Sequence, residues 1–180
     1  DTDGGGYFFA ADDTRDLILC SHAGKDALLA TQASPTAPLQ PTDLYRRLDM
    51  RMAAAKPAAA ILDTLADLFP GNENDRTLAR QFIGLLRALA IKHDCAVILL
   101  AHPSLSGLNS GSGTSGSTGW NNSVRSRLYL ERIIQDGYEA NPDARVLSTK
   151  KANYGRTGGE INLTWRNGVF VADAPVTALD

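Results

Sequence analysis

The sequence is poor in the features that would assign a protein to a membrane, zinc-binding or basic nucleic-acid-binding class. Its two cysteines, Cys20 and Cys95, have no metal-ligand spacing, and a reduced, cytoplasmic setting is the simplest interpretation. No apolar run reaches the roughly 18 residues of a membrane-spanning helix, so we expect no membrane partner. The formal net charge of −2 excludes a globally basic field, so any contact with nucleic acid must be local.

The chain also lacks a signal peptide and an initiator Met, since it begins Asp-Thr-Asp-Gly-Gly-Gly. We therefore expect a fragment or a processed product, in which residues 1–16 are poorly specified. The length of 180 residues fits one domain or a large piece of one, and it is sufficient for a sizeable core.

Two apolar segments that end in polar residues are the most informative part of the chain. Residues 58–64 read Ala-Ala-Ala-Ile-Leu-Asp-Thr, and residues 95–102 read Cys-Ala-Val-Ile-Leu-Leu-Ala-His. Unbroken apolar runs of this length predict strands buried on both faces of a parallel sheet. Ligands of such sheets bind beyond the carboxyl ends of the strands. Asp63 and His102 are therefore candidates for one site.

The rest of the chain predicts helices first and antiparallel strands later. One helix is expected to begin near Thr42, and a second to begin after Asn74 or Asp75, because each start carries a capping residue. The second helix buries five apolar side chains at helical spacing: Leu78, Phe82, Leu85, Leu86 and Leu89. Short strands are expected at residues 17–20 and 27–30, with a proline-containing loop over residues 31–41.

Beyond residue 103, the composition changes and the pattern becomes β-rich. Residues 104–119 contain five Gly, six Ser and two Thr, which predicts a flexible loop. A short helix over residues 118–124 and strands at 126–133 and 145–150 should follow. Residues 159–172 form a hairpin, because Asn167-Gly168 favours a type I′ turn between alternating segments. The predicted fold class is α/β, with a mostly parallel sheet flanked by helices and an antiparallel hairpin at its end.

Each candidate functional residue has a structural alternative. Asp63 can hold Mg²⁺, directly or through water, beside a nucleotide's phosphates, or it caps the turn after its strand. His102 can sense a γ-phosphate, or it packs and caps. Arg125 would share one side of a strand with Arg127 and could reach a neighbouring subunit, or both are surface charges.

Two further sets of residues are left open in the same way. Lys150 and Lys151 can face a nucleotide across an interface, or they end an exposed strand. The Gly/Ser loop can bind phosphates through its backbone, although it contains no Lys, Arg or aromatic residue, or it is a linker. The segment of residues 21–26 is not a P-loop, because Asp26 follows Lys25 where the motif needs Ser or Thr.

In combination and in order, these motifs resemble those of the RepA-like AAA ATPases. The segments concerned are Ile-Leu-Asp-Thr-Leu-Ala-Asp-Leu-Phe, Leu-Leu-Ala-His-Pro-Ser, Ser-Val-Arg-Ser-Arg and Lys-Ala-Asn-Tyr-Gly, and the resemblance runs from about residue 17 to residue 172. That family belongs to the RecA-like P-loop superfamily and includes hexameric plasmid and phage replicative helicases.

The resemblance implies a partial RecA-like ATPase core, ATP and Mg²⁺ as cofactors, and a homo-oligomeric ring, expected to be a hexamer, that engages single-stranded DNA. It implies that Asp63 is the Walker B acid, with Thr64 beside it, His102 the γ-phosphate sensor and Arg125 the arginine finger, with Lys150 or Lys151 contributing in trans. It also places a DNA-binding loop of the ring's channel at Ser106, Gly107, Ser110, Gly111, Ser112 and Gly113.

The chain departs from this family in one respect. Its members carry a Walker A P-loop and a catalytic glutamate upstream, and neither occurs in these 180 residues. Two hypotheses follow: the chain is part of an ATP-hydrolysing, ring-forming ATPase or DNA helicase, or it is a non-catalytic assembly or DNA-binding module derived from one.

Overall fold

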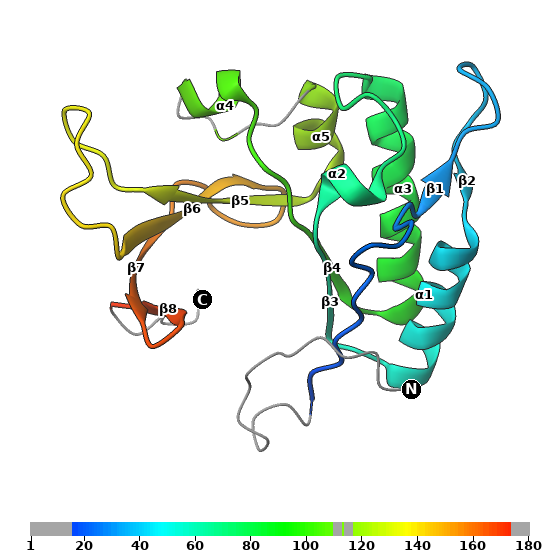
Figure 1. Cartoon of the computed structure of the whole chain (residues 1–180), viewed down its shortest axis with the longest axis horizontal. Coiled ribbons are helices and arrows are strands. Elements are labelled where there is room, and N and C mark those ends of the chain that lie inside the picture. The colour runs from blue at the N-terminus through cyan, green and yellow to red at the C-terminus, as the bar shows by residue number, and fades with distance from the viewer. Residues whose placement is uncertain (1–15, 110–112, 114–116, 174–180) are drawn as a thin grey trace.

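The computed structural model describes residues 16–109, 113 and 117–173, and the side chains of Leu105 and Ser106 are not among the described atoms. Two long helices and a pair of parallel strands form one half of the molecule, and a four-stranded antiparallel sheet extends from them (Figure 1). None of the described helices is both long and apolar enough to cross a membrane.

The two long helices begin and end where capping chemistry predicts. Helix α1 (Asp43–Ala55) starts after Thr42, whose side chain accepts a hydrogen bond from the Tyr45 amide. Helix α3 (Arg76–His93) starts after Asp75, whose carboxylate accepts hydrogen bonds from two amides of the first turn. Both helices end at a residue in the left-handed conformation, Lys56 and Asp94. The sequence prediction of both helices is confirmed.

Strands β3 (Ala59–Leu62) and β4 (Ala96–Leu99) pair in parallel, with Leu62 opposite Leu99. The helix between them, α3, packs on one face of the pair, where Leu62, Val97 and Leu99 contact the core. Strand, helix and parallel strand form one βαβ unit, as the alternation of apolar runs and helical periodicity predicts.

The prediction that these two strands are buried on both faces is wrong. Exposure alternates along each strand, and Ile61 (63% exposed), Ile98 (44%) and Leu100 (42%) lie on the open face. The helices cover one face, and no described residue buries the other. The expected mostly parallel sheet is present only as this pair, since every other strand pairing in the described chain is antiparallel.

The C-terminal half is an antiparallel sheet in the order β5-β6-β7-β8. Its strands are β5 (Ser126–Arg132), β6 (Ala144–Ala152), β7 (Glu160–Arg166) and β8 (Val169–Ala172). The β7–β8 hairpin turns at Asn167 and Gly168, which both have positive φ as a type I′ turn requires. The predicted hairpin is therefore confirmed, and it continues a larger sheet.

Three local predictions need correction. Residues 17–20 are irregular, because no described strand pairs with them, and the expected strand at 27–30 is reduced to β1 (Ala30–Thr31) paired with β2 (Gln40–Pro41). Short helices α2 (Leu65–Leu68) and α4 (Leu105–Asn109) lie where no helix was predicted. Helix α5 (Thr118–Ser123) matches the predicted short helix.

The core is centred on α3 and is closed by an aromatic cluster. Phe82 on α3 is fully buried, and its ring meets the edges of Phe69 and Trp120 at centroid distances of 5.3 and 6.3 Å. The Trp120 indole N–H donates to the Glu73 carbonyl over 2.8 Å. This cluster fastens α5 to α3, because Trp120 is the buried aromatic residue of that short helix.

A charged cluster joins the C-terminal halves of α1 and α3. Lys92 donates to one oxygen of Asp49 over 2.6 Å, and the ring of His93 lies 2.7 Å from the other. The hydrogen bond from Lys92, followed by that from His93, lowers the pKa of the Asp49 carboxyl. The cluster therefore stabilises the contact between the two helices when Asp49 is ionised.

We expect Asp49→Asn to lower the free energy of unfolding at pH 7 by about 0.5–1.5 kcal/mol. The lowered pKa means that this contribution is complete above the unfolded carboxyl's pKa of about 3.9 and is lost as the pH falls through the folded pKa. Urea unfolding of both proteins at pH 7 and at pH values below about 4 checks this. A difference that stays constant down to the acid limit of folding would contradict it.

Candidate functional site

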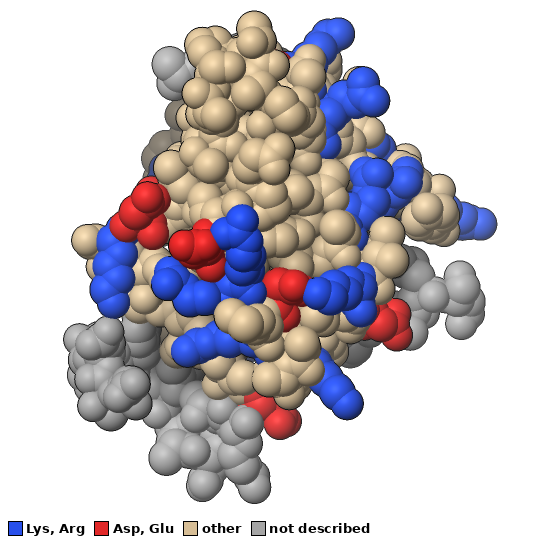
Figure 2. Space-filling view, turned by 90° about the vertical axis from the view of Figure 1, so that its right-hand side faces the viewer, with Lys and Arg blue, Asp and Glu red and all other residues tan. Residues whose placement is uncertain are grey.

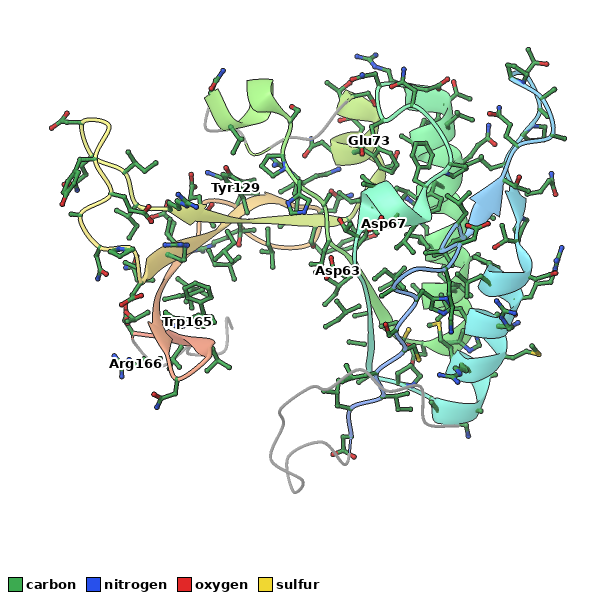
Figure 3. The ribbon with its side chains drawn as sticks, in the orientation of Figure 1. Asp63, Asp67, Glu73, Tyr129, Trp165 and Arg166 are labelled. Carbon is green, nitrogen blue, oxygen red and sulfur yellow. The ribbon has the colours of Figure 1, made fainter. Side chains whose placement is uncertain are left out.

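The carboxyl ends of β3 and β4 bring the predicted site residues to one edge. Asp63 follows β3 directly, and the Thr64 hydroxyl donates to the Leu100 carbonyl over 3.1 Å. The Leu65 amide donates to the same carbonyl over 2.8 Å, so the two chain segments stay paired one step beyond the strands. Asp63 is exposed at the end of β3, beside α2 with its own Asp67 (Figure 3). The peptide bond between Asp63 and Thr64 is cis.

His102 belongs to the same edge but not to the strand. Strand β4 ends at Leu99, so the predicted strand over residues 95–102 is too long, and His102 lies three residues beyond its end. Its side chain is exposed. The parallel register still places Asp63 and His102 past corresponding ends of neighbouring strands, as predicted.

The residues at this edge can hold a hydrated cation through one protein ligand, the Asp63 carboxylate. The Asp63 carboxylate makes no hydrogen bond or ion pair to any described residue, so both oxygens are available. Mg²⁺ is commonly held by one or two carboxylates, with water and substrate phosphates completing its shell. No group of three or more His, Cys, Asp or Glu side chains within the described ranges forms a metal cluster, so the remaining ligands would be phosphate and water.

The two predicted arginines do not share a strand face. Arg125 lies in the connection between α5 and β5, and only Arg127 is in β5. The Arg127 guanidinium donates to the Asn121 side chain over 2.9 Å, so it is held against α5. Arg125 is exposed, and its guanidinium makes no hydrogen bond or ion pair to a described residue. Of the pair, Arg125 is the one free to meet another molecule.

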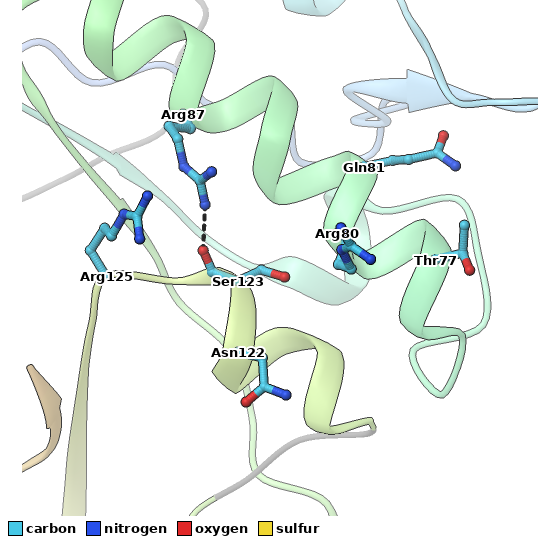
Figure 4. A pocket seen from close by; sticks show the side chains of 7 residues that line it. All are labelled: Thr77, Arg80, Gln81, Arg87, Asn122, Ser123 and Arg125. Atoms are coloured by element: carbon cyan, nitrogen blue, oxygen red, sulfur yellow. Dashed lines mark hydrogen bonds between the residues drawn. The ribbon is translucent and has the colours of Figure 1, made fainter. Parts of the chain in front are cut away.

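Arg125 lines a hollow between α3 and the end of α5. The cavity has a volume of about 570 Å³ and is lined by Thr77, Arg80, Gln81, Arg87, Asn122, Ser123 and Arg125. Arg87 on α3 donates to the Ser123 carbonyl over 2.6 Å. In Figure 4, Arg87 and Arg125 reach from opposite sides toward the space beside Ser123. We call this cavity the arginine hollow.

The predicted lysines have partners within the chain. Lys150 lies 3.3 Å from a carboxylate oxygen of Glu131 and 5.5 Å from the centre of the Tyr129 ring. Lys151 donates to the carbonyls of Asn121, Val124 and, at longer range, Asn122. Lys151 therefore closes the C-terminal end of α5, where unpaired carbonyls attract cations.

The residues predicted to contact DNA divide into two groups. Ser110, Gly111 and Ser112 lie outside the described residues. Ser106 and Gly107 belong to α4, so part of the predicted loop is helical, and Gly107 is buried. Gly113 has a φ of +61°, and its amide donates to the Gly107 carbonyl over 3.0 Å. A Cβ at Gly113 would come within 2.5 Å of the Tyr129 ring, so this glycine permits a close approach to β5.

Sequence analysis missed two members of the arginine hollow, Arg80 and Arg87. Both are on α3 at a spacing of seven residues, which places them on one helical face. That spacing was visible in the sequence. The spacing indicates a shared cavity only because α5 and Arg125 lie against that face of α3, and no local pattern predicts this.

Comparison with known proteins assigns the fold. A sequence model described as "AAA domain" matches residues 7–107, which is more than half of the chain. No match is found among curated proteins.

Two solved structures share the fold. One, described as an ATPase domain, is similar with a TM-score of 0.57 and 19% identity, covering 72% of this chain and 50% of that one. A structure of "a DnaB-like replicative helicase and its interactions with primase" is similar with a TM-score of 0.55 and 17% identity, covering 70% of this chain and 33% of that one. The chain thus spans half or less of the length of these proteins. At these identities the likeness concerns the fold alone.

Proposed function

The chain belongs to the AAA domain family, and on that premise we propose that it supplies part of the catalytic site of an ATP-hydrolysing, ring-forming ATPase acting on DNA in plasmid or phage replication. The observation that carries the proposal is the parallel register of β3 and β4. It places the Asp63 carboxylate, which no described residue pairs with, and the imidazole of His102 at one sheet edge. That edge is where open α/β sheets bind their ligands.

In this proposal, Asp63 holds Mg²⁺ directly or through water, and Mg²⁺ supplies charge stabilisation at the phosphates. Thr64 holds the Asp63 segment against β4, because its hydroxyl is bonded to the Leu100 carbonyl. His102 donates a hydrogen bond to the terminal phosphate from an exposed position past the strand. Lys150 and Lys151 act indirectly, since each already has partners in the sheet or on α5.

Asp63→Asn in the full-length protein tests this assignment. Removing the carboxylate's charge should lower ATP hydrolysis by about 10²-fold or more, because the metal loses its protein ligand. Asp67→Asn is the matched control, since Asp67 is exposed on α2 four residues further on and undergoes the same chemical change. Steady-state ATPase rates at saturating Mg-ATP are the measurement. Equal rates in both variants would refute the role of Asp63.

The contact with DNA is assigned to residues 104–119. Their backbone amides and hydroxyl groups suit phosphates and carry no sequence information. The loop lacks the basic and aromatic side chains that usually line single-strand grooves. We therefore propose that this segment tracks the backbone of single-stranded DNA in the channel of a ring and that affinity comes from other parts of the protein.

The alternative is a non-catalytic assembly module, and the open face of the parallel pair favours it. Ile61, Ile98 and Leu100 are exposed apolar side chains on one face, which suits packing against another chain or segment. The two proposals differ in their requirement for a phosphate cradle. A Gly-x-x-x-x-Gly-Lys-Ser/Thr segment encoded in frame before Asp1 supports the enzyme, and a start codon directly before Asp1 supports the module.

A further inference from the structure

We propose that the arginine hollow binds a small phosphate-bearing anion, namely the polyphosphate group of a metabolite or nucleotide, within a single copy of this chain. The cavity is lined by three arginines and four neutral polar residues, and no carboxylate of the described part of the chain lines it. Guanidinium groups present forked donors that match phosphate oxygens and keep their charge at any physiological pH. The inference does not rest on the proposed ATPase role, because it concerns binding by one copy.

The backbone carbonyls that would repel an anion near the hollow already accept hydrogen bonds from cationic side chains. The carbonyls at the C-terminal end of α5 carry partial negative charge. Arg87 donates to the Ser123 carbonyl, and Lys151 donates to those of Asn121 and Val124. The Arg80 and Arg125 guanidinium groups are left without a hydrogen-bond or ion-pair partner among the residues that the structure describes. Arg87 and Lys151 therefore prepare the site, and Arg80, which has no part in the proposed ATPase role, remains for the ligand.

The local concentration of positive charge is not a general property of the surface. In the lower part of the face shown in Figure 2, basic and acidic side chains lie next to one another. The exposed ion pairs of the chain follow the same pattern, as Arg46 with Asp43 and Lys92 with Asp49 show. The arginine hollow differs because its cations face a cavity without a carboxylate in its lining.

Gly84 leaves the face of α3 between Arg80 and Arg87 without a side chain. It lies four residues after Arg80 and three before Arg87, on the same helical face. A glycine inside a helix costs about 1 kcal/mol relative to alanine. Packing does not account for it, since a Cβ at Gly84 would meet no atom within 4 Å. The missing side chain keeps space open between the two arginines.

The size and lining of the hollow favour a compact ligand over a nucleic-acid strand. A volume of about 570 Å³ is typical of small-molecule sites. Strand-binding grooves combine basic side chains with aromatic stacking platforms, and none of the described aromatic residues lines this cavity. The hydroxyls of Thr77 and Ser123 and the amide of Asn122 add neutral donors suited to phosphate oxygens, whereas the Gln81 amide oxygen accepts from the Leu39 N–H over 2.7 Å.

Calorimetric titration of this chain with tripolyphosphate tests the proposal. We expect saturable binding with a dissociation constant on the order of 0.1–1 mM at low salt. Arg80→Gln should weaken it about tenfold, the effect of losing one charge-assisted contact. Arg47→Gln is the matched control, because Arg47 is exposed on α1 and undergoes the same change of charge. It should bind like the unmodified chain.

Gly84 supplies a variant that leaves every arginine in place. Gly84→Gln should fill the space between Arg80 and Arg87 and weaken binding at least as much as Arg80→Gln. Gly84→Ala should keep the affinity. Both substitutions favour the helix, so loss of fold would not explain a difference.

Three outcomes would overturn the proposal. They are no saturable binding of tripolyphosphate, equal affinity of the Arg80→Gln and Arg47→Gln variants, or full affinity after Gly84→Gln. A single-stranded oligonucleotide that binds more tightly than tripolyphosphate, with the same loss in Arg80→Gln, would assign the arginine hollow to a nucleic-acid backbone and overturn the small-ligand assignment. Because the assay needs no hydrolysis, its failure is separate from failure of the proposed ATPase role.

Discussion

Arg125→Ala in the full-length protein is expected to lower the steady-state rate of ATP hydrolysis by about 10³-fold or more and to leave Mg-ATP binding almost unchanged. The guanidinium of Arg125 is exposed at the junction of α5 and β5, and no described residue pairs with it. If this guanidinium enters the nucleotide site of a neighbouring subunit, it lies next to the negative charge that develops on the transferred phosphoryl group. It would therefore stabilise the transition state more than the bound nucleotide.

The comparison needs a control for loss of an exposed arginine near the same sheet. Arg132→Ala serves, because Arg132 ends β5 and forms only a 3.4 Å surface pair with Glu139. We expect its ATPase rate to remain within about twofold of the unmodified protein, as a pair of this kind contributes little. Normal turnover by the Arg125→Ala variant would refute the arginine-finger assignment. Mixed rings of the Arg125→Ala and Asp63→Asn subunits should regain partial activity if Arg125 acts in trans.

Trp120→Ala should lower the free energy of unfolding by about 3–5 kcal/mol. Trp120 is 7% exposed, and its ring meets that of Phe69 at a centroid distance of 5.0 Å. The substitution would leave a large cavity beside Phe82 and release α5 from α3. Since Arg125 and the arginine hollow depend on where α5 lies, we also expect the tripolyphosphate affinity of the chain to fall.

The loss of unfolding free energy in Trp120→Ala can be separated into a packing part and a hydrogen-bonding part. Trp120→Phe keeps most of the ring volume but removes the donor to the Glu73 carbonyl, and it should cost about 1–3 kcal/mol. Urea unfolding followed by far-ultraviolet circular dichroism is the measurement, because the fluorescence of the remaining Trp165, which is 44% exposed, reports on the other sheet. A loss below about 1 kcal/mol for Trp120→Ala would show that the cluster does not stabilise the fold.

Local chemistry accounts for the elements that were predicted correctly. Thr42 and Asp75 cap the helices that follow them, because their side chains can reach the first free amides whatever the rest of the chain does. Asn167 and Gly168 form the hairpin turn because they adopt positive φ at low cost. The apolar run before Asp63 forms a parallel strand next to the run before His102, which required only the βαβ rule.

The errors arise where distant segments decide the outcome. The open face with Ile61 and Ile98 was predicted to be buried, because apolar residues reveal a preference for burial but not whether another layer is present. Strand β5 begins at Ser126, as predicted, but Arg125 lies before it in the connection from α5 and so cannot share a strand side with Arg127. Lys151 donates to carbonyls at the C-terminal end of α5, and no local pattern predicted these contacts.

The sequence by itself therefore determined the two long helices, the parallel pair, the hairpin and the edge that carries Asp63 and His102, because caps, turns and hydrophobic periodicity act over a few residues. Only the tertiary structure decided that Arg80 and Arg87 share a cavity with Arg125. Arg125 meets the two arginines of α3 there because Trp120 packs against Phe69 and Phe82 and brings α5 against α3. Burial of that indole is a long-range event, and the spacing of the arginines along the chain contains no record of it.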